Sequence, residues 1–156
     1  MSLSNANAKT LPTNATEVQF DNQTQVTTDF SPRGGAIQAA ANFIRQAKSQ
    51  VLIAAYGFTS PEIAQAIVDV YKRNIKIQVV LDRSNKKAKY SSTNFLANSG
   101  VDVRINSKYA IMHHKFIVVD DKLALGSMNF SRAGETRNAE NFNIFTGSQK
   151  LTDVYA

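Results

Sequence analysis

The feature that most constrains the fold is the order in which two kinds of apolar pattern follow each other. The continuous apolar run "QVLIAAYGF" (50–58) has the length of a strand and is typical of one covered on both faces. A helix start comes next, because Thr59 or Ser60 can cap it and Pro61 suits its first turn. A second strand, "IKIQVVLD" (75–82), follows that helix. This order predicts parallel strands joined by a right-handed crossover.

The remaining patterns extend this unit into an α/β domain. We expect a strand at 24–30, a helix within 36–49 and a short helix that ends at Gly100. Strand-rich sequence follows, with strands expected at 101–106, 115–120, 123–129 and 141–147. The chain is therefore predicted to form a single domain over residues 21–156, with a mixed sheet and helices on both faces.

The two ends of the chain carry weaker signals. Residues 1–20 are rich in Asn, Thr and Ser, which predicts a disordered polar tail. This tail lacks the apolar core of a signal peptide, so we expect either a cytoplasmic protein or an exported, periplasmic bacterial protein without its signal. The tail and the absence of cysteine slightly favour export. At the other end, a last helix is expected to begin near Ala156 and to be truncated there.

The charge of the chain indicates its partners. A net charge of +6 predicts attraction to polyanions, although on charge alone a solvated basic face without a ligand is the preferred interpretation. No apolar run approaches the ~20 residues that span a bilayer, so no stable membrane insertion is expected. A basic run, "RSNKKAKY", follows a strand at the end where ligands of α/β sheets bind, although a solvated loop is the alternative for any single lysine. The candidate nucleic-acid-binding residues are Arg83, Lys86, Lys87, Lys89, Arg104 and Lys108.

Both histidines of the chain lie at the start of an apolar strand, in "HHKFIVVDDKLALGSMNFS" (113–131). Strand alternation sends His113 and Lys115 to one side and His114 to the other. A neutral imidazole attacks phosphorus without a separate base, so His113 is the candidate nucleophile. Lys115 supplies a fixed positive charge for the oxygens of a phosphodiester. His114 is expected to be structural or to face solvent.

The end of the same stretch supplies hydrogen bonds for those oxygens, from Ser127 and Asn129. The complete pattern is His-x-Lys, four residues, Asp120, a short gap, and then Gly126-Ser-x-Asn. It resembles the signature of the phospholipase D superfamily. Downstream, "AGETRNAENF" resembles the Asn-x-Glu-Asn element of the small bacterial endonucleases in that superfamily, and the similarity extends over residues 24–150.

The resemblance implies an endonuclease that hydrolyses nucleic-acid phosphodiester bonds through a covalent phosphohistidine, with DNA as the expected partner and RNA not distinguished from it. This endonuclease is expected to be sequence-nonspecific, because nothing in the sequence indicates readout of base edges. It assigns Glu140 as the carboxylate that orients His113, with Glu135 as the less well placed competitor. Asp120 and Gly126 are implied to be structural parts of the signature. The odd spacing of Asp120 from His113 also turns this carboxylate away from the site.

The resemblance also predicts a homodimer. Displacement at phosphorus needs a nucleophile on one side and a proton donor on the other, and one His113 cannot occupy both places. The chain holds one copy of the signature, and the short nucleases it resembles form two-fold dimers, so a single composite site across the axis is expected. Neither a metal nor any other cofactor is expected, because two histidines and no clustered carboxylates make a poor divalent site.

One departure from the signature leaves alternatives open. Five residues separate Asp120 from Gly126, one fewer than is usual, and losing one residue in a strand reverses the face of all that follows. Either the turn absorbs the change or a residue is missing from the sequence; otherwise Ser127 and Asn129 are misdirected. The alternative functions are a phospholipid phosphodiesterase, which should show an apolar patch beside the site, and a non-catalytic nucleic-acid-binding dimer.

Overall fold

The computed structural model of the chain describes residues 15–88 and 91–156. Residues 1–14 of the expected tail and the candidate Lys89 lie outside the described residues, and residues 15–20 contain no helix or strand. The strands are β1 (Gln25–Ser31), β2 (Gln50–Ala55), β3 (Lys76–Asp82), β4 (Asp102–Asn106), β5 (Lys115–Val119), β6 (Lys122–Gly126) and β7 (Glu140–Thr146). The helices are α1 (Ala36–Arg45), α2 (Pro61–Tyr71), α3 (Thr93–Asn98), α4 (Arg132–Thr136) and α5 (Gln149–Tyr155), with a 3-10 turn at Arg83–Lys86.

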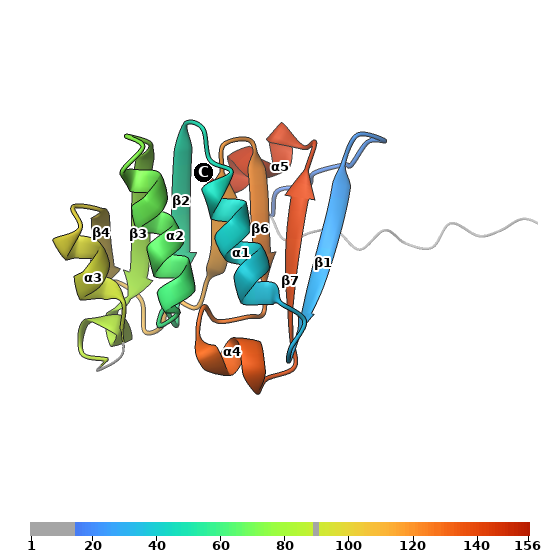
Figure 1. The fold of residues 1–156 in the computed structure, drawn as a ribbon. Coiled ribbons are helices and arrows are strands. Elements are labelled where there is room, and N and C mark those ends of the chain that lie inside the picture. The colour runs from blue at the N-terminus through green and yellow to red at the C-terminus, as the bar shows by residue number, and fades with distance from the viewer. Residues whose placement is uncertain (1–14, 89–90) are drawn as a thin grey trace, which may run out of the picture.

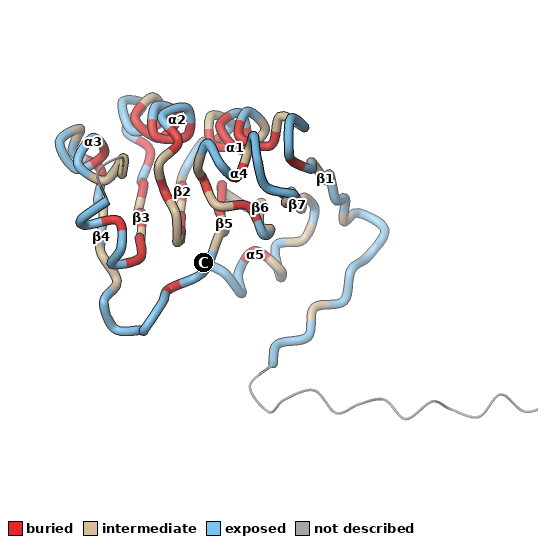
Figure 2. Tube along the Cα trace, turned by 90° about the horizontal axis from the view of Figure 1, so that it is seen from below, coloured by how far each residue is buried: buried red, intermediate tan, exposed pale blue. Residues whose placement is uncertain are grey.

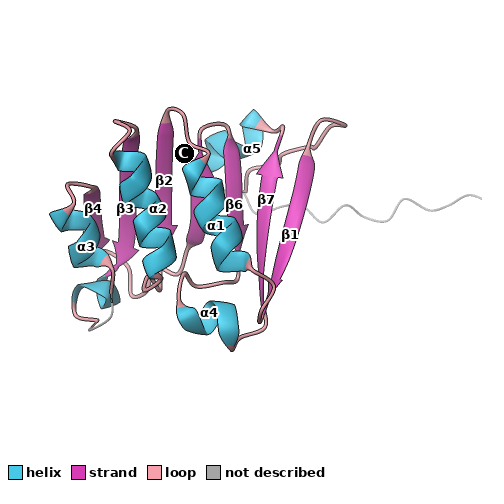
Figure 3. Cartoon of the chain, in the orientation of Figure 1, coloured by secondary structure: helices cyan, strands magenta, loops and turns pink. Residues whose placement is uncertain are grey.

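The strands form one mixed sheet in the order β1-β7-β6-β5-β2-β3-β4. The expected β–α–β unit is present, because β2 and β3 are parallel neighbours joined through α2, and β4 pairs in parallel with β3. The pairs β2–β5, β5–β6, β6–β7 and β1–β7 are antiparallel. Helices α1, α2 and α3 lie on one face of the sheet and α5 lies on the other (Figures 1 and 3). The α/β fold with helices on both faces is therefore confirmed.

The core lies mainly between the sheet and the helices α1 and α2, where buried residues concentrate (Figure 2). The apolar face of α1, which includes Ala40 and Ile44, is buried. Helix α2 begins as its sequence predicts, with the Ser60 side chain accepting a hydrogen bond from Ile63 N–H at 3.2 Å. Within the described residues, no helix has both the length and the apolar character needed to cross a bilayer.

The β5–β6 hairpin absorbs the shorter gap of the signature. Val119 pairs with Lys122, so only Asp120 and Asp121 form the turn. The backbone of Asp120 has a positive φ of 54°, a conformation that aspartate tolerates better than most residues. Strand β6 ends at Gly126 rather than continuing to residue 129 as expected, so the residues beyond it no longer follow strand alternation.

One edge of the sheet brings together the segments that carry the signature. Strands β2, β3 and β6 end there, whereas β5 and β7 begin there, at the lower edge in Figure 1. Helix α4 and the chain that precedes β5 lie beside the same edge. The site is built on this edge.

Candidate active site

His113 and Lys115 lie together at this edge. The ammonium nitrogen of Lys115 is 3.1 Å from Nδ1 and 3.2 Å from Nε2 of His113, and it donates to the His113 carbonyl at 2.9 Å. The ring of Tyr56, which directly follows β2, packs on the imidazole with a centroid separation of 4.5 Å. Lys115 Nζ lies 5.4 Å from the centroid of the same ring, within the range of a cation–π contact.

His114 points to the opposite face of the sheet. Its ring lies 5.9 Å from that of Phe116, centroid to centroid, and Phe116 in turn contacts Tyr155 of α5 at 5.2 Å. The separation of the two histidines expected from strand alternation is therefore confirmed. Because Lys115 packs with His113 and Phe116 packs with His114, the alternation extends to the residues just before β5.

Ser127 and Glu140 complete this side of the site. Ser127 Oγ donates to Glu140 Oε2 at 2.6 Å, and Asn138 Nδ2 donates to Glu140 Oε1 at 2.9 Å. Burial lowers the pKa of Lys115, and the nearby Glu140 carboxylate partly offsets this by raising it. Among the described residues the hydrogen-bond donors to the Glu140 carboxylate are Ser127 and Asn138, and not His113.

Asn129 is held by Gly57, a residue outside the signature. Its Oδ1 accepts a hydrogen bond from Gly57 N–H at 3.2 Å. A Cβ on Gly57 would lie 3.2 Å from both Cγ and Oδ1 of Asn129, so this glycine permits a close approach. Tyr56 and Gly57 belong to the apolar run 50–58 but lie beyond the end of β2. A glycine at the end of that apolar run was the signal that could have marked them.

The remaining residues of the signature, Asp120 and Gly126, make structural contacts. The Asp120 carboxylate accepts hydrogen bonds from the chain before β2, and these lower its pKa to about 2 although burial raises it. A Cβ on Gly126 would collide with the Asn141 carbonyl on β7. Glu135 accepts hydrogen bonds from Gly35 N–H at 3.1 Å and Ile37 N–H at 2.8 Å, so it caps α1 and does not enter the site.

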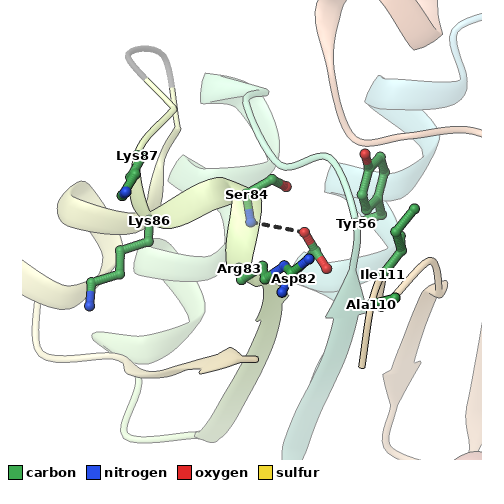
Figure 4. Close-up of a pocket in the computed structure, with 8 residues that line it drawn as sticks. All are labelled: Tyr56, Asp82, Arg83, Ser84, Lys86, Lys87, Ala110 and Ile111. Atoms are coloured by element: carbon green, nitrogen blue, oxygen red, sulfur yellow. Dashed lines mark hydrogen bonds between the residues drawn. The ribbon is translucent and has the colours of Figure 1, made fainter. Parts of the chain in front are cut away.

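The candidate nucleic-acid-binding residues that the structure describes lie in separate places. Arg83, Lys86 and Lys87 line a pocket of 480 Å³ beside Tyr56 (Figure 4). Arg104 lines a separate pocket with Phe116 and Tyr155 on the α5 side of the sheet.

Two exposed residues complete this basic set. The guanidinium of Arg104 is paired with Asp102 at 2.8 Å. Lys108 Nζ lies 5.7 Å from the ring centroid of Tyr109. Among the candidates that the structure describes, Arg83, Lys86 and Lys87 are the neighbours of the site.

Two buried polar residues fix the 3-10 turn that carries these cations. Asp82 accepts hydrogen bonds from Ser84 N–H and Met112 N–H, each at 2.8 Å, and Met112 directly precedes His113. Asn85 donates to the Tyr56 carbonyl at 2.5 Å. Hydrogen bonds therefore connect the basic turn to Tyr56 and to the residue before His113, and the rings of Tyr56 and His113 are in contact. Neither Asp82 nor Asn85 was identified from the sequence.

No three His, Asp or Glu residues within 15–88 and 91–156 lie close enough together to hold a metal ion.

Known proteins resemble this chain in sequence and in fold. Residues 41–156 match the family described as "Cardiolipin synthase, PLD-like domain". The phospholipase D of Rickettsia felis is 34% identical over 155 residues, which are 96% of this chain and 77% of that protein. Four further Rickettsia proteins named phospholipase D are matched over 64% to 66% of their length.

Two solved structures share the fold and part of the sequence. The phospholipase D family member Nuc from Salmonella typhimurium has a TM-score of 0.81 and 34% identity, over 85% of this chain and 89% of that one. NucT from Helicobacter pylori has a TM-score of 0.74 and 25% identity, over 85% and 91% of the two chains. The protein therefore belongs to the phospholipase D superfamily, in its branch of small bacterial members, and is a hydrolase of the phosphodiesterase class.

Proposed function

We propose that the protein is a metal-independent, sequence-nonspecific endonuclease that cleaves DNA through a covalent phosphohistidine at a site shared across a homodimer. The observation that carries this proposal is the contact between the His113 imidazole and the Lys115 ammonium group, 3.1 Å apart at the sheet edge. A nucleophile and a fixed cation at that distance suit a phosphodiester. The adjacent pocket with three cations favours a polyanionic substrate.

In the first step a ring nitrogen of His113 attacks phosphorus. The new N–P bond forms as the P–O bond to the leaving group breaks, and His113 of the partner subunit gives that oxygen a proton. Lys115 and the Asn129 amide hold the phosphoryl oxygens. Asn129 is suited to this because Gly57 N–H occupies its Oδ1, which leaves its N–H₂ group to donate. Water then attacks phosphorus, gives a proton to the partner's His113 and releases His113.

Glu140 has two roles in this proposal. In its own chain it holds Ser127 beside the phosphate and raises the pKa of Lys115, which keeps the ammonium form populated. Because it does not bond His113 of the same chain, we assign the orientation of each His113 to Glu140 of the partner subunit.

A second candidate is a phospholipid phosphodiesterase. It is favoured by the names of the Rickettsia relatives and by the description of the matching family. The third possibility, a non-catalytic dimer, depends on misdirected Ser127 and Asn129 side chains. The hydrogen bond between Ser127 and Glu140 argues against this possibility.

The test is to assay plasmid DNA and phosphatidylcholine vesicles side by side, with EDTA present, against a His113→Asn control. We expect nicking of DNA that persists in EDTA, falls steeply with salt and is absent in the control. Hydrolysis of phosphatidylcholine without cleavage of DNA would instead identify the second candidate. Binding of DNA without hydrolysis of either substrate would support the third. Loss of cleavage in EDTA with recovery in Mg²⁺ would refute metal independence.

A further inference from the structure

We propose that the 480 Å³ pocket beside His113 binds one unpaired base of the substrate, so that single strands are the preferred substrate class. This inference rests on the proposed nuclease function and deepens it. A pocket of this size lies within the range that holds small organic groups.

The position of the pocket suits a base next to the reacting phosphate. Tyr56 forms one wall of the pocket, and its ring also contacts the His113 imidazole at 4.5 Å. In Figure 4, Tyr56 and Ile111 stand on one side of the pocket and the basic turn stands on the other. A group in the pocket and a phosphate at His113 would therefore lie on either side of one tyrosine ring, as neighbouring parts of one nucleotide chain.

The walls of the pocket suit a flat, uncharged ring. Tyr56 offers an aromatic side chain, and Ile111 is an aliphatic side chain that is 57% exposed beside it. Aromatic side chains stack on any base, which matches a nuclease that does not read sequence.

One buried acidic residue of the pocket disfavours a phosphate in contact with it. This residue, Asp82, is only 3% exposed. Burial raises its pKa, but hydrogen bonds from Ser84 and Met112 outweigh this, so the pKa lies below its usual value and the carboxylate stays charged. An anion in contact with this carboxylate is repelled, whereas Lys86 and Lys87, which also line the pocket, can receive phosphates. An ionised carboxylate in the pocket also disfavours a lipid acyl chain.

A base of duplex DNA enters the pocket at a higher cost in free energy than an unpaired base. A base within a duplex is stacked and paired, and placing it in a pocket requires it to leave the stack. The turn that forms one wall is held by the buried Asn85 and Asp82, so the pocket is preformed rather than assembled by the substrate. An already unpaired base therefore enters without the cost of unstacking.

Binding to the inactive His113→Asn chain tests this inference apart from catalysis. The probes are a fluorescein-labelled single strand, an abasic strand with the same number of phosphates, and a blunt duplex, compared by anisotropy at one salt concentration. We expect the base-containing strand to bind about tenfold more tightly than the abasic strand, as one stacked base can provide. Adding Ile111→Ser should reduce this ratio to about threefold or less. Adding instead Val26→Ser, at a 48% exposed position on β1, should leave it unchanged.

Each other outcome has a definite meaning. Equal binding of base-containing and abasic strands, or a preference that survives Ile111→Ser, would overturn the pocket assignment. The pocket assignment would also be overturned if Ile111→Ser abolished binding to phosphatidylglycerol vesicles but left binding to the oligonucleotide unchanged. If the active chain cleaves single, abasic and duplex strands equally, the nuclease proposal stands and the pocket assignment falls. If it cleaves none of them while the Ile111-dependent preference persists, the nuclease proposal falls and the pocket assignment stands.

Discussion

Replacing Asp120 by asparagine should destabilise the protein through one well-defined contact. The Asp120 carboxylate accepts from the N–H groups of Lys48, Ser49 and Gln50 at 2.9, 2.8 and 3.0 Å, and from Ser49 Oγ at 2.7 Å. These bonds attach the β5–β6 turn to the chain that enters β2. Asparagine also tolerates the positive φ of this position, so the substitution changes the hydrogen bonds and the charge without adding backbone strain.

The size of the effect follows from the pKa. Burial raises the pKa of Asp120, but the hydrogen bonds lower it from 3.8 to about 2. This difference in pKa corresponds to about 2.5 kcal/mol, and because the carboxylate is partly exposed to solvent we reduce this to about 1 kcal/mol. An amide group that faces three N–H donors leaves at least one of them unsatisfied, which costs about 1 kcal/mol more. We therefore expect Asp120→Asn to lose about 2 kcal/mol of unfolding free energy at pH 7.

Urea unfolding at several pH values measures this loss and its origin. The stability that comes from the lowered pKa is present above the unfolded-state value of 3.8, and it is lost as the pH falls through about 2. The difference between wild type and Asp120→Asn should therefore shrink between about pH 5 and pH 2. Asp121→Asn is the matched control, since the Asp121 side chain makes no hydrogen bond among the described residues. Equal losses in the two variants, or a difference that stays constant down to pH 2, would refute the reasoning.

Four further predictions concern the site. His113→Asn should abolish cleavage of DNA while His114→Ala retains most of it; the reverse result would contradict the assigned faces. Glu140→Gln removes the charge that raises the pKa of Lys115, so the alkaline limb of the pH–rate profile should move to lower pH, and an unmoved limb would show that Lys115 does not set it. Tungstate should inhibit competitively and, in a soaked crystal, lie near His113, Lys115 and Asn129 rather than elsewhere. When wild-type chains are refolded with excess His113→Asn chains, activity should follow roughly the square of the wild-type fraction, because general acid catalysis is worth about 10²–10⁴-fold; a linear dependence would exclude a shared site.

The parts of the site that the sequence predicted are those set by local periodicity. The opposite orientations of His113 and His114 follow from a repeat of two residues, which the β5 backbone imposes over a short distance. The same two-residue repeat predicts that the Asp120 side chain points away from His113. The parallel β2–β3 pair was also predictable, because a strand, a capped helix and a strand occur in order with little sequence between them.

What the sequence did not predict depends on contacts between distant segments. Gly57 and Asn129 are 72 residues apart, and Asn85 reaches the Tyr56 carbonyl across 29 residues. Neither pair shares a period or a motif that would link it in advance. Arg104 was grouped with the other cations by charge alone, whereas its position on β4 turns it toward the α5 side of the sheet.

The shorter gap in the signature shows which interactions place the chemical groups. The loss of one residue after Asp120 would turn Ser127 to the other face of the sheet only if β6 continued through Ser127. Strand β6 ends at Gly126, so this does not happen. Ser127 is instead positioned from the other side, by N–H donation to the Asn141 carbonyl at 3.1 Å and by its bond to Glu140. The β6–β7 pairing therefore fixes Ser127 relative to Glu140, and the β2–β5 pairing fixes Lys115 relative to the end of β2. The β5–β6 turn has only to join the two strands, so its length can vary by a residue while these groups keep their places.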